Sequence, residues 1–516
     1  MSEKLFKSTA IVSMMTFISR ILGFIRDIVI ARMFGAGLGA DVFFVAFKIP
    51  NFLRRLFAEG AFSQAFIPVL AEYRQRGDKD LKQLIANTSG TLAAILFAIT
   101  ALGVIAAPIL IMIFAPGFID DPHKIGLAGD LLKITFPYLF FISLTAFAGS
   151  ILNSFGKFAV PAFTPVFLNL SLIGCAVWLS PHLDEPVAAL AWGVFIGGVI
   201  QLLFQIPFLL KIGQLPKPRW GWNDSGVKKI TTLMIPAMFG VSVAQINLLL
   251  DTLLASFLVT GSISWLYYSD RLVEFPLGIF GIALSTVILP SLSKKHASAS
   301  KAEFSHTIDW ALRWVFIIAT PAAIGLIWLA EPLLMTLFQY GEFTPQDAHK
   351  ASLSLMAYGL GLLPFIFIKV LAPGYYARQD TKTPVKIGII AMVTNMVLNI
   401  ILMMHYAHVG LALATAISAA LNAGLLYLGL RKEGVYQPDA AWGSFCLKLL
   451  IPNTAVLLLL VWLTPDMSQW TEGSVWQRVT MLFGLIAASM TLYFIVLSAI
   501  GIKIKTLLKP NQPANL

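Results

Sequence analysis

Long apolar segments recur along the whole chain, and they constrain its fold more than any other feature. Each is close to the 20 or so residues that a helix needs to cross the hydrocarbon core of a bilayer. Backbone N–H and C=O groups in lipid must be bonded within the protein, and a helix satisfies them within one segment. The fourteen predicted spans are 10–32, 40–71, 84–114, 130–152, 160–180, 187–210, 230–258, 264–290, 308–330, 350–376, 384–405, 408–430, 443–464 and 477–501.

The composition leads to the same fold class. Hydrophobic residues make up 58% of the 516 residues and charged residues 12%, whereas soluble chains average about 45–50% and about 25%. We therefore predict an all-α polytopic membrane protein. Its two cysteines, Cys175 and Cys446, lie in apolar runs, which excludes a disulfide framework. Arg20 and Arg26 interrupt the first apolar run, so we expect a retained membrane helix there rather than a cleaved signal.

The charges of the connecting loops alternate in sign along the chain. An even number of spans places both termini on one side, and the loops of that side are basic, for example at Arg74, Arg76 and Lys79. The loops of the other side are mostly acidic, as at Asp184 and Glu185. Because basic loops stay in the cytoplasm, both termini are predicted to be cytoplasmic. These loops account for most of the net charge of +11, so no nucleic-acid partner is needed.

A weak internal repeat divides the chain into two similar halves. Shifted by 222 residues, "AFSQAFIPVL" (61–70) aligns with "ALSTVILPSL" (283–292); at one residue more, Pro161 aligns with Pro384. The offset spans six helices, so the halves have the same orientation, as in transporters with parallel repeats. We expect an N-lobe of six helices (1–215), a C-lobe of six helices (216–435), and two C-terminal helices (436–516).

Charged residues lie inside the first two predicted helices of each half. At about 100° per residue, one face of the second helix carries Asp41, Lys48, Arg55 and Glu59. A kink at Pro50 leaves open whether Arg54 or Arg55 faces the same way. The charged residues are Arg20, Arg26 and Asp27 in the first helix, Asp41, Lys48, Arg54, Arg55 and Glu59 in the second, Asp251 in the seventh, and Asp270, Arg271 and Glu274 in the eighth.

These charges predict a polar interior. An arginine at the bilayer centre costs about 2.5–3.5 kcal/mol, so the charged groups must face protein or water. Internal ion pairs would explain some of them, and we interpret the pair Asp309 and Arg313 as structural. Basic residues outnumber acidic ones, however, and arginine binds phosphate in a bidentate manner. We therefore expect a cationic cavity between the halves for an anionic, phosphate-bearing substrate. The supporting residues would be Asp27, Asp270, Glu274 and Lys369.

Several common functional motifs are missing from the sequence. It contains no Walker A motif, no HExxH and no Gly-rich dinucleotide turn. We therefore expect no cofactor, no metal site and no ATP hydrolysis by this chain.

Four stretches of the sequence are characteristic: "SRILGFIRDIVIARMFGAG", "DVFFVAFKIPNFLRRLFAEGAFSQAFIPVLAEY", "SWLYYSDRLVEFPLGIFGIALSTVILPSLS" and "VLAPGYYARQDTKTPVKI". They closely resemble the MurJ (MviN) family of lipid II flippases, within the multidrug/oligosaccharidyl-lipid/polysaccharide exporter superfamily. The resemblance implies two six-helix lobes and two C-terminal helices that form a groove for the undecaprenyl tail. It also implies transfer of the lipid-linked peptidoglycan precursor from the cytoplasmic to the periplasmic leaflet of the bacterial plasma membrane, a step required for cell-wall synthesis.

The resemblance assigns roles to particular residues. Some relatives bind sodium in the second lobe, where Asp251 and Asp380 are possible acidic ligands, although few other oxygen ligands follow them. The implied partners are lipid II, membrane lipid and cell-wall synthesis proteins, with the chain itself a monomer. The arginines important in the family match Arg20, Arg26, Arg54 and Arg271, and its aspartate at the start of the second helix matches Asp41.

Two other functions are weighed against a flippase that works by alternating access. A drug exporter of the same superfamily, driven by proton or sodium exchange, would carry mainly cations, which a cationic cavity disfavours. A membrane glycosyltransferase would need paired carboxylates in an outer loop as base and metal site. The candidates there are Asp120 with Asp121 and Glu342 with Asp347.

Overall fold

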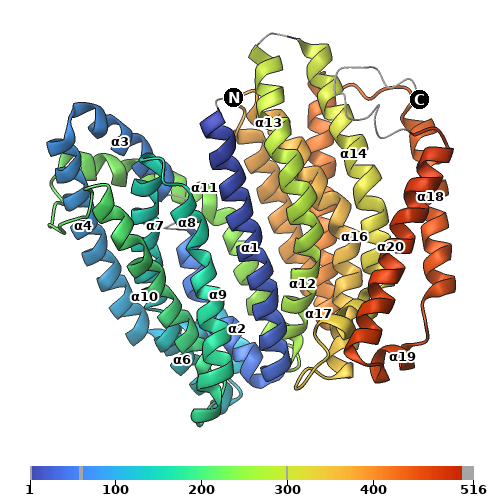
Figure 1. Ribbon diagram of the computed structural model, residues 1–516, viewed down its shortest axis with the longest axis horizontal. Coiled ribbons are helices and arrows are strands. Elements are labelled where there is room, and N and C mark those ends of the chain that lie inside the picture. Colours follow the sequence, from blue (N-terminus) through green and yellow to red (C-terminus); the bar gives the residue numbers. More distant parts are fainter. Residues whose placement is uncertain (1–2, 57–61, 298–299, 503–516) are drawn as a thin grey trace. The chain divides into compact units, whose positions relative to one another are not determined.

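The chain folds almost entirely into helices, as the computed structural model shows (Figure 1). The structure describes residues 3–56, 62–297 and 300–502, without the side chains of 3–10, 239–244, 282, 283, 285–287 and 297. Within these ranges no strand occurs, and the predicted all-α class is confirmed. Packing divides the chain into two compact units, Met1–Ser264 and Trp265–Leu516. The predicted boundaries at 215/216 and 435/436 follow the sequence repeat rather than the packing, and they stay predictions.

Within the described residues, the first unit contains eleven α-helices and the start of a twelfth. Within it, α10 packs on α7 and α9, α1 packs on α8 and α9, and α3 packs on α4, α7 and α11. Its elements are α1 (Glu3–Phe34), α2 (Leu38–Arg54), α3 (Ser63–Arg76), α4 (Asp78–Ile105), α5 (Ala107–Phe114), a 3₁₀ turn (Pro116–Phe118), α6 (Pro122–Thr135), α7 (Tyr138–Ser154), α8 (Ala159–Phe163), α9 (Pro165–Gly174), a π-helical turn (Cys175–Leu179), a 3₁₀ turn (Ser180–His182), α10 (Ala188–Lys211) and α11 (Ser225–Ala255).

The second unit contains the rest of α12, which begins in the first unit, and the helices that follow. Within it, α16 packs on α13, α14, α15 and α17, and α18 packs on α14 and α20. Its elements are α12 (Ser262–Pro276), a π-helical turn (Leu277–Gly281), α13 (Ile282–Ala297), α14 (Lys301–Trp328), α15 (Ala330–Leu337), α16 (Pro345–Tyr376), α17 (Lys382–Lys432), α18 (Trp442–Leu463), α19 (Met467–Glu472) and α20 (Val475–Ala499).

Nine helical segments within the described residues are long and apolar enough to cross a membrane. One of them, α17, has 51 residues and contains a break at Ala407, where the backbone has φ 49° and ψ −130°. The break separates the two predicted spans 384–405 and 408–430. The predicted spans 10–32 and 40–71, which carry internal charges, correspond to α1 and to α2 with α3. The count of fourteen therefore stays a prediction, while the polytopic helical fold is established.

The helix boundaries repeat with nearly the offset found in the sequence. Helices α4 and α14 each have 28 residues, α5 and α15 each have eight, and within each pair the starting residues are 223 apart. The same offset relates the starts of α6 and α16, and both have proline in the first turn. Their caps also correspond, since the side chain of Asp121 caps α6 and that of Thr344 caps α16. The repeat is therefore present in local structure as well as in sequence.

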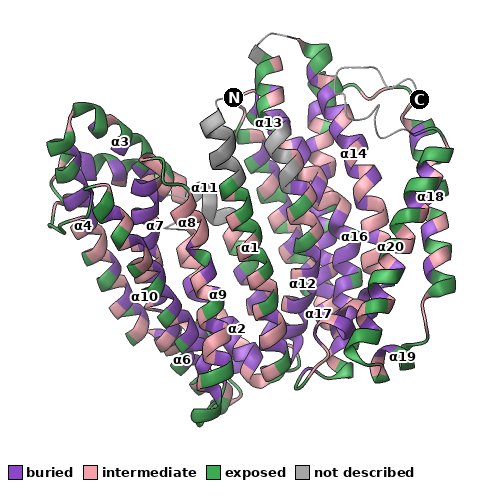
Figure 2. Ribbon diagram, viewed as in Figure 1, coloured by how far each residue is buried: buried purple, intermediate pink, exposed green. Residues whose placement is uncertain are grey.

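Many large apolar residues are exposed, and exposed positions recur along the helices of both units (Figure 2). Phe97, Ile105 and Trp462 are 68%, 77% and 84% exposed, which is costly in water and favourable in lipid. Burial inside the protein is low for the two C-terminal spans, at 28% of the apolar window of α18 and 17% of that of α20. The side chains of these two helices therefore face mainly lipid or an apolar ligand.

Candidate functional site

The charged residues predicted to bind a head group are distributed over both units. In the first unit Arg20 is exposed on α1 and Lys48 is half-buried on α2. In the second unit, α12 carries three of these residues: Asp270 and Glu274 are exposed, and Arg271 is half-buried. Exposed charges on membrane helices face water or a polar ligand, because exposure to lipid would cost several kcal/mol. Each unit therefore presents polar groups within otherwise apolar helices.

Arg26 is held by neighbours on two helices of the first unit. Its guanidinium donates to the Asp27 carboxylate through Nε and Nη2, at 2.9 and 2.7 Å, and to Asn169 Oδ1 through Nη1 at 3.0 Å. Asn169, on α9, donates to the Ser19 carbonyl at 3.1 Å. Asp27 is buried beside this guanidinium, so the two charges compensate inside the protein. Arg26 and Asp27 thus form a pair that Asn169 holds in position.

Arg54 and Arg55 lie where α2 ends. Arg54 is the last residue of the helix and donates from Nε to Asn51 Oδ1 at 2.8 Å, while Arg55 is the C-cap residue. Both are half-buried, so burial does not favour either one as the cavity-facing arginine. Glu59, predicted on the same stripe, lies outside the described residues.

Asp41 is buried and its carboxylate receives three hydrogen bonds within the first unit. The donors are the Gly261 N–H at 2.6 Å, the Ser264 N–H at 2.8 Å and Ser264 Oγ at 2.6 Å. These N–H groups belong to the beginning of α12, whose first turn lacks intrahelical acceptors and favours a negative charge. In this structure Asp41 serves as a helix cap, and its contact with a head group stays a prediction.

The charged cluster on α12 is held by contacts within the second unit. Arg271 Nη1 donates to Glu274 Oε2 at 2.7 Å, and the guanidinium lies 4.9 Å from the ring centroid of Tyr267. Lys369, on α16, is exposed, with its side chain close to Gly281. An exposed Arg–Glu pair contributes little to stability, about 0–1 kcal/mol. The binding of a ligand by these charges stays a prediction.

The predicted acidic ion ligands have different surroundings. Asp251 is half-buried on α11. Asp380 accepts from the Thr383 N–H at 3.0 Å at the start of α17, and hydrogen bonds from the side chain and backbone of Thr383 lower the pKa of its carboxyl. Farther along α17, Asn399 donates to Asn395 at 2.9 Å, and both are buried. Among the described residues, no group of three or more His, Cys, Asp or Glu side chains could hold a metal ion.

Arg478 is a buried charged residue that sequence reasoning missed. It donates from Nε to the Gly473 carbonyl at 2.9 Å, from Nη2 to the Thr471 carbonyl at 2.6 Å, and from Nη1 to the Met335 and Gln339 carbonyls at 3.2 and 3.3 Å. These carbonyls lie at and just beyond the ends of α15 and α19, where acceptors lack intrahelical donors. The sequence feature that could have identified it is a single arginine in the first turns of α20, a helix with no other charged residue.

The predicted pair of Asp309 and Arg313 is confirmed and belongs to a larger network. Arg313 donates from Nε to Asp309 at 2.9 Å and from Nη2 to Asp439 at 3.0 Å, and it is almost fully buried. The Tyr436 hydroxyl and the Trp442 indole N–H donate to Asp309 Oδ1 at 2.8 and 2.5 Å. Burial and the nearby Asp309 carboxylate raise the pKa of Tyr436 well above its ordinary value, which keeps this donor protonated.

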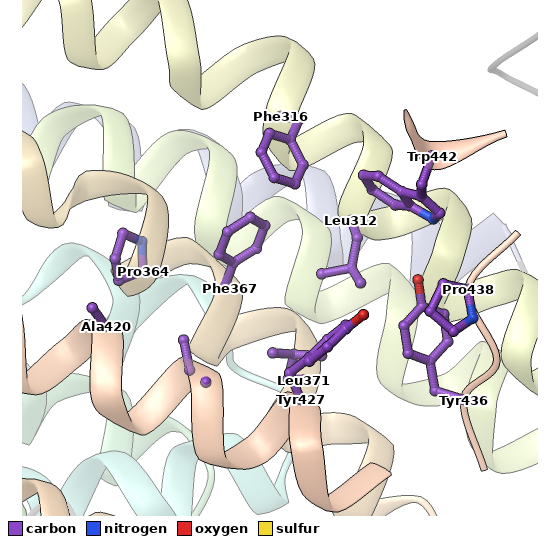
Figure 3. A pocket seen from close by; sticks show the side chains of 12 residues that line it. Leu312, Phe316, Pro364, Phe367, Leu371, Ala420, Tyr427, Tyr436, Pro438 and Trp442 are labelled. Atoms are coloured by element: carbon purple, nitrogen blue, oxygen red, sulfur yellow. The ribbon is translucent and has the colours of Figure 1, made fainter. Parts of the chain in front are cut away.

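An apolar cavity of about 470 Å³ lies beside this network in the second unit (Figure 3). Helices α14, α16 and α17 and the segment leading into α18 line it, and the rings of Phe316, Phe367 and Trp442 surround the space. Small residues on α17, among them Ala420 and Gly424, leave room on the opposite wall. The volume and lining suit an apolar chain rather than a polar head group.

Comparison with known proteins identifies the family. The family described as "Lipid II flippase MurJ" matches residues 30–481. A Vibrio cholerae protein named "Probable lipid II flippase MurJ" is 55% identical, over 98% of each chain, and a Haemophilus influenzae protein of the same name is 52% identical, over 96% of this chain and 100% of its own. The chain belongs to the MurJ family.

Solved structures agree with this membership. The structure titled "Lipid II flippase MurJ, inward closed conformation" is 28% identical, with a TM-score of 0.82 over 96% of this chain and 99% of its own. A multidrug resistance MATE family transporter of the MOP superfamily, in its inward-facing conformation, has a TM-score of 0.66 at 14% identity, over 83% of this chain and 98% of its own. The second likeness concerns the fold alone. As a MurJ family member with many apolar helices, the protein is a multi-pass protein of the inner membrane.

Proposed function

We propose that this protein is a lipid II flippase, a transporter that moves the lipid-linked peptidoglycan precursor across the bacterial inner membrane. Membership of the MurJ family over most of the chain is the observation that carries this proposal. Charged groups on α1, α2 and α12 would bind the anionic head group. The apolar cavity and the lipid-facing helices α18 and α20 would accommodate the tail. Translocation would run from the cytoplasmic to the periplasmic leaflet by alternating access, with both termini in the cytoplasm.

The head-group site would use the arginines as pyrophosphate ligands. Arg20 and Arg271 are the best placed, because Arg20 is exposed and the side chain of Arg271 remains partly exposed beside the exposed Glu274. Arg54, Arg55 and Lys48 would add positive charge, while Arg26 already shares its donors with Asp27 and Asn169. The guanidinium group offers paired donors that match two phosphate oxygens. The supporting role of Asp270, Glu274 and Lys369 would be to set the charge and orientation of this site.

The tail site would be the cavity beside the Asp309–Arg313 network, together with α18 and α20. A fully extended undecaprenyl chain is longer than the hydrocarbon core is thick, at about 30 Å, so the tail must bend or lie against protein. A cavity of about 470 Å³ holds only part of such a chain. The proposed tail site is therefore a contact for one end of the chain and not a complete enclosure.

The surroundings of the acidic residues in the outer loops are more consistent with a transporter than with a glycosyltransferase. Asp121 accepts the N–H groups of His123 and Lys124 and caps α6. Asp347 takes part in the capping box of α16 and accepts from the Trp265 indole at 2.9 Å. One carboxylate of each candidate pair is thus committed to a helix cap, while Asp120 and Glu342 are exposed. A pair with one member already hydrogen-bonded in a cap is poorly suited to act as base and metal site, which favours transport over glycosyl transfer.

The decisive experiment is transport by the purified protein. We expect liposomes that contain only this chain to move lipid II between leaflets, measured by the access of an enzyme or label added outside. Arg271→Ala and Arg20→Ala should reduce the initial rate at least about tenfold, the loss expected for one charged phosphate contact. Arg219→Ala, which removes an exposed arginine that lines neither described cavity, is the matched control. Absence of transport by folded wild-type protein under any imposed ion gradient would refute the proposed function.

A second assay tests the same site in cells. We expect Arg271→Ala to fail to support growth of a cell depleted of its own flippase, although the variant inserts normally. Normal growth with either arginine variant would argue against the pyrophosphate site while leaving the transport function intact.

A further inference from the structure

A second cavity, of about 410 Å³, lies within the first unit, and its lining includes none of the charged residues of α1 and α2 considered above. It is lined by the beginning of α1, the segment between α7 and α8, and the end of α10. One part of its lining is apolar, with Ile11, Phe158, Val160 and Phe208. The lining is therefore amphipathic, unlike the apolar cavity of the second unit.

Two lysines supply the polar part of this cavity. Lys157 and Lys211 both line it and both are exposed. The structure records no ion pair for either ammonium group within the described residues, and no acidic residue lines the cavity. Lys211 Nζ lies 5.6 Å from the ring centroid of Phe208, a weak cation–π contact that leaves its three N–H donors available. Two cations beside an apolar wall form a surface that complements an amphiphilic anion.

The position of the two lysines at helix ends indicates which class of amphiphilic anion the cavity would bind. Lys157 follows Gly156, whose φ of +75° ends α7, and Lys211 is the last residue of α10. Ends of membrane helices lie at the level of the lipid head groups, and basic pockets between such ends bind anionic head groups. We propose that this cavity binds an anionic phospholipid, with its phosphate at Lys157 and Lys211 and one acyl chain along Phe158, Val160 and Phe208.

The proposal can be tested by lipid binding to the purified full chain in a non-ionic detergent. Native mass spectrometry would give apparent affinities for phosphatidylglycerol, for phosphatidylcholine with the same acyl chains, and for glycerol phosphate, which has no chains. We expect phosphatidylglycerol to bind best. The double variant Lys157→Gln, Lys211→Gln should weaken its binding about 10- to 30-fold, the effect of two lysines near an anionic head group.

Matched variants distinguish specific binding at this cavity from a general effect of positive charge on lipid binding. Lys217→Gln with Lys228→Gln removes the same charge from exposed positions of the same unit that do not line the cavity, and it should leave binding unchanged. Lys157→Arg with Lys211→Arg keeps the charge and should retain binding within about threefold. Because both lysines are exposed, unchanged thermal unfolding should accompany all three pairs.

Three results would overturn the proposal. Wild-type affinity in the glutamine pair, or an equal loss in the control pair, would show that the cavity is not the binding site. Glycerol phosphate binding as tightly as phosphatidylglycerol would identify a site for free phosphate. Loss of lipid II binding with unchanged phosphatidylglycerol binding would assign the cavity to the transported substrate instead. This inference does not rest on the flippase activity, since the assay measures binding of a membrane lipid.

Discussion

Asn169 on α9 accepts a hydrogen bond from Arg26 on α1 and donates one to the carbonyl of Ser19 on the same helix. One amide thus fixes both the guanidinium and the helix that carries it. We expect Asn169→Ala to lower the free energy of unfolding by about 1–3 kcal/mol, because it removes a part-buried acceptor of a charged donor. Thermal unfolding of the purified protein would measure this, with Asn223→Ala, at an exposed position, as the control. An unchanged unfolding temperature would show that Arg26 finds another acceptor.

The sequence predicted the helices well because lipid leaves few alternatives for a long apolar segment. It placed two spans on either side of Ala407, where the structure has one element with a local break. It also predicted the Asp309–Arg313 pair, whose members are one helical turn apart. Local spacing and the cost of charge in lipid were sufficient for these features.

Buried polar contacts between distant segments were not predictable in the same way. Asn169 lies 143 residues from Arg26, and the local pattern of α9 does not show which distant residue this asparagine contacts. Arg478 binds backbone carbonyls, and a backbone partner leaves no trace in the sequence of the partner segment. The sequence did not predict that the Asp41 carboxylate caps the start of α12. Such contacts depend on tertiary packing, which periodicity does not report.

Arg478 should be the most sensitive charged position of the C-terminal helices. We expect Arg478→Lys to destabilise the protein by at least about 3 kcal/mol, because an ammonium group cannot reach carbonyls of both α15 and α19, and each buried carbonyl left unpaired costs about 1–3 kcal/mol. The measurement is thermal unfolding in detergent. Arg431→Lys, at an exposed site of the same unit, is the control and should change little. If both variants unfold alike, water replaces the lost donor.

The buried pair of Asp309 and Arg313 should show strong coupling. Asp309→Asn removes one charge and leaves the other buried, so we expect a loss of about 3–5 kcal/mol. Replacing both, as Asp309→Asn with Arg313→Met, should cost less than the single change, because no buried charge is then left and Asp439, which loses Arg313, is partly exposed. A double-mutant cycle on unfolding free energies measures the coupling. Additive losses would mean that Asp439 alone compensates Arg313.

The apolar cavity can be filled from Gly424 on α17. A side chain built there meets no atom within 4 Å at its Cβ, and leucine has a higher helix propensity than glycine by about 0.8–1 kcal/mol. We expect Gly424→Leu to preserve folding and to reduce the rate of lipid II transport, since it occupies the proposed tail site. Gly388→Leu, on the same helix, outside the cavity and equally open at its Cβ, should transport like the wild type. Equal rates in the two variants would exclude the cavity as a tail site.

The membrane potential should drive the transport cycle if the head-group charge crosses the field. A lipid-linked diphosphate is an anion, and moving one charge through the whole field changes the free energy by about 2.3 kcal/mol per 100 mV. A potential that is negative inside would push the loaded, net anionic complex outward and would draw the emptied, cationic site back toward the cytoplasm. Both half-cycles would then gain from one field, which fits a chain without a nucleotide-binding motif.

The measurement is the access of lipid II from outside in liposomes clamped at several potentials, with no proton or sodium gradient. We expect the rate to rise with inside-negative potential, and Arg26→Gln to alter the slope if that charge moves through the field. A rate independent of voltage would point to ion coupling instead, and Asp251→Asn would then be the first variant to examine.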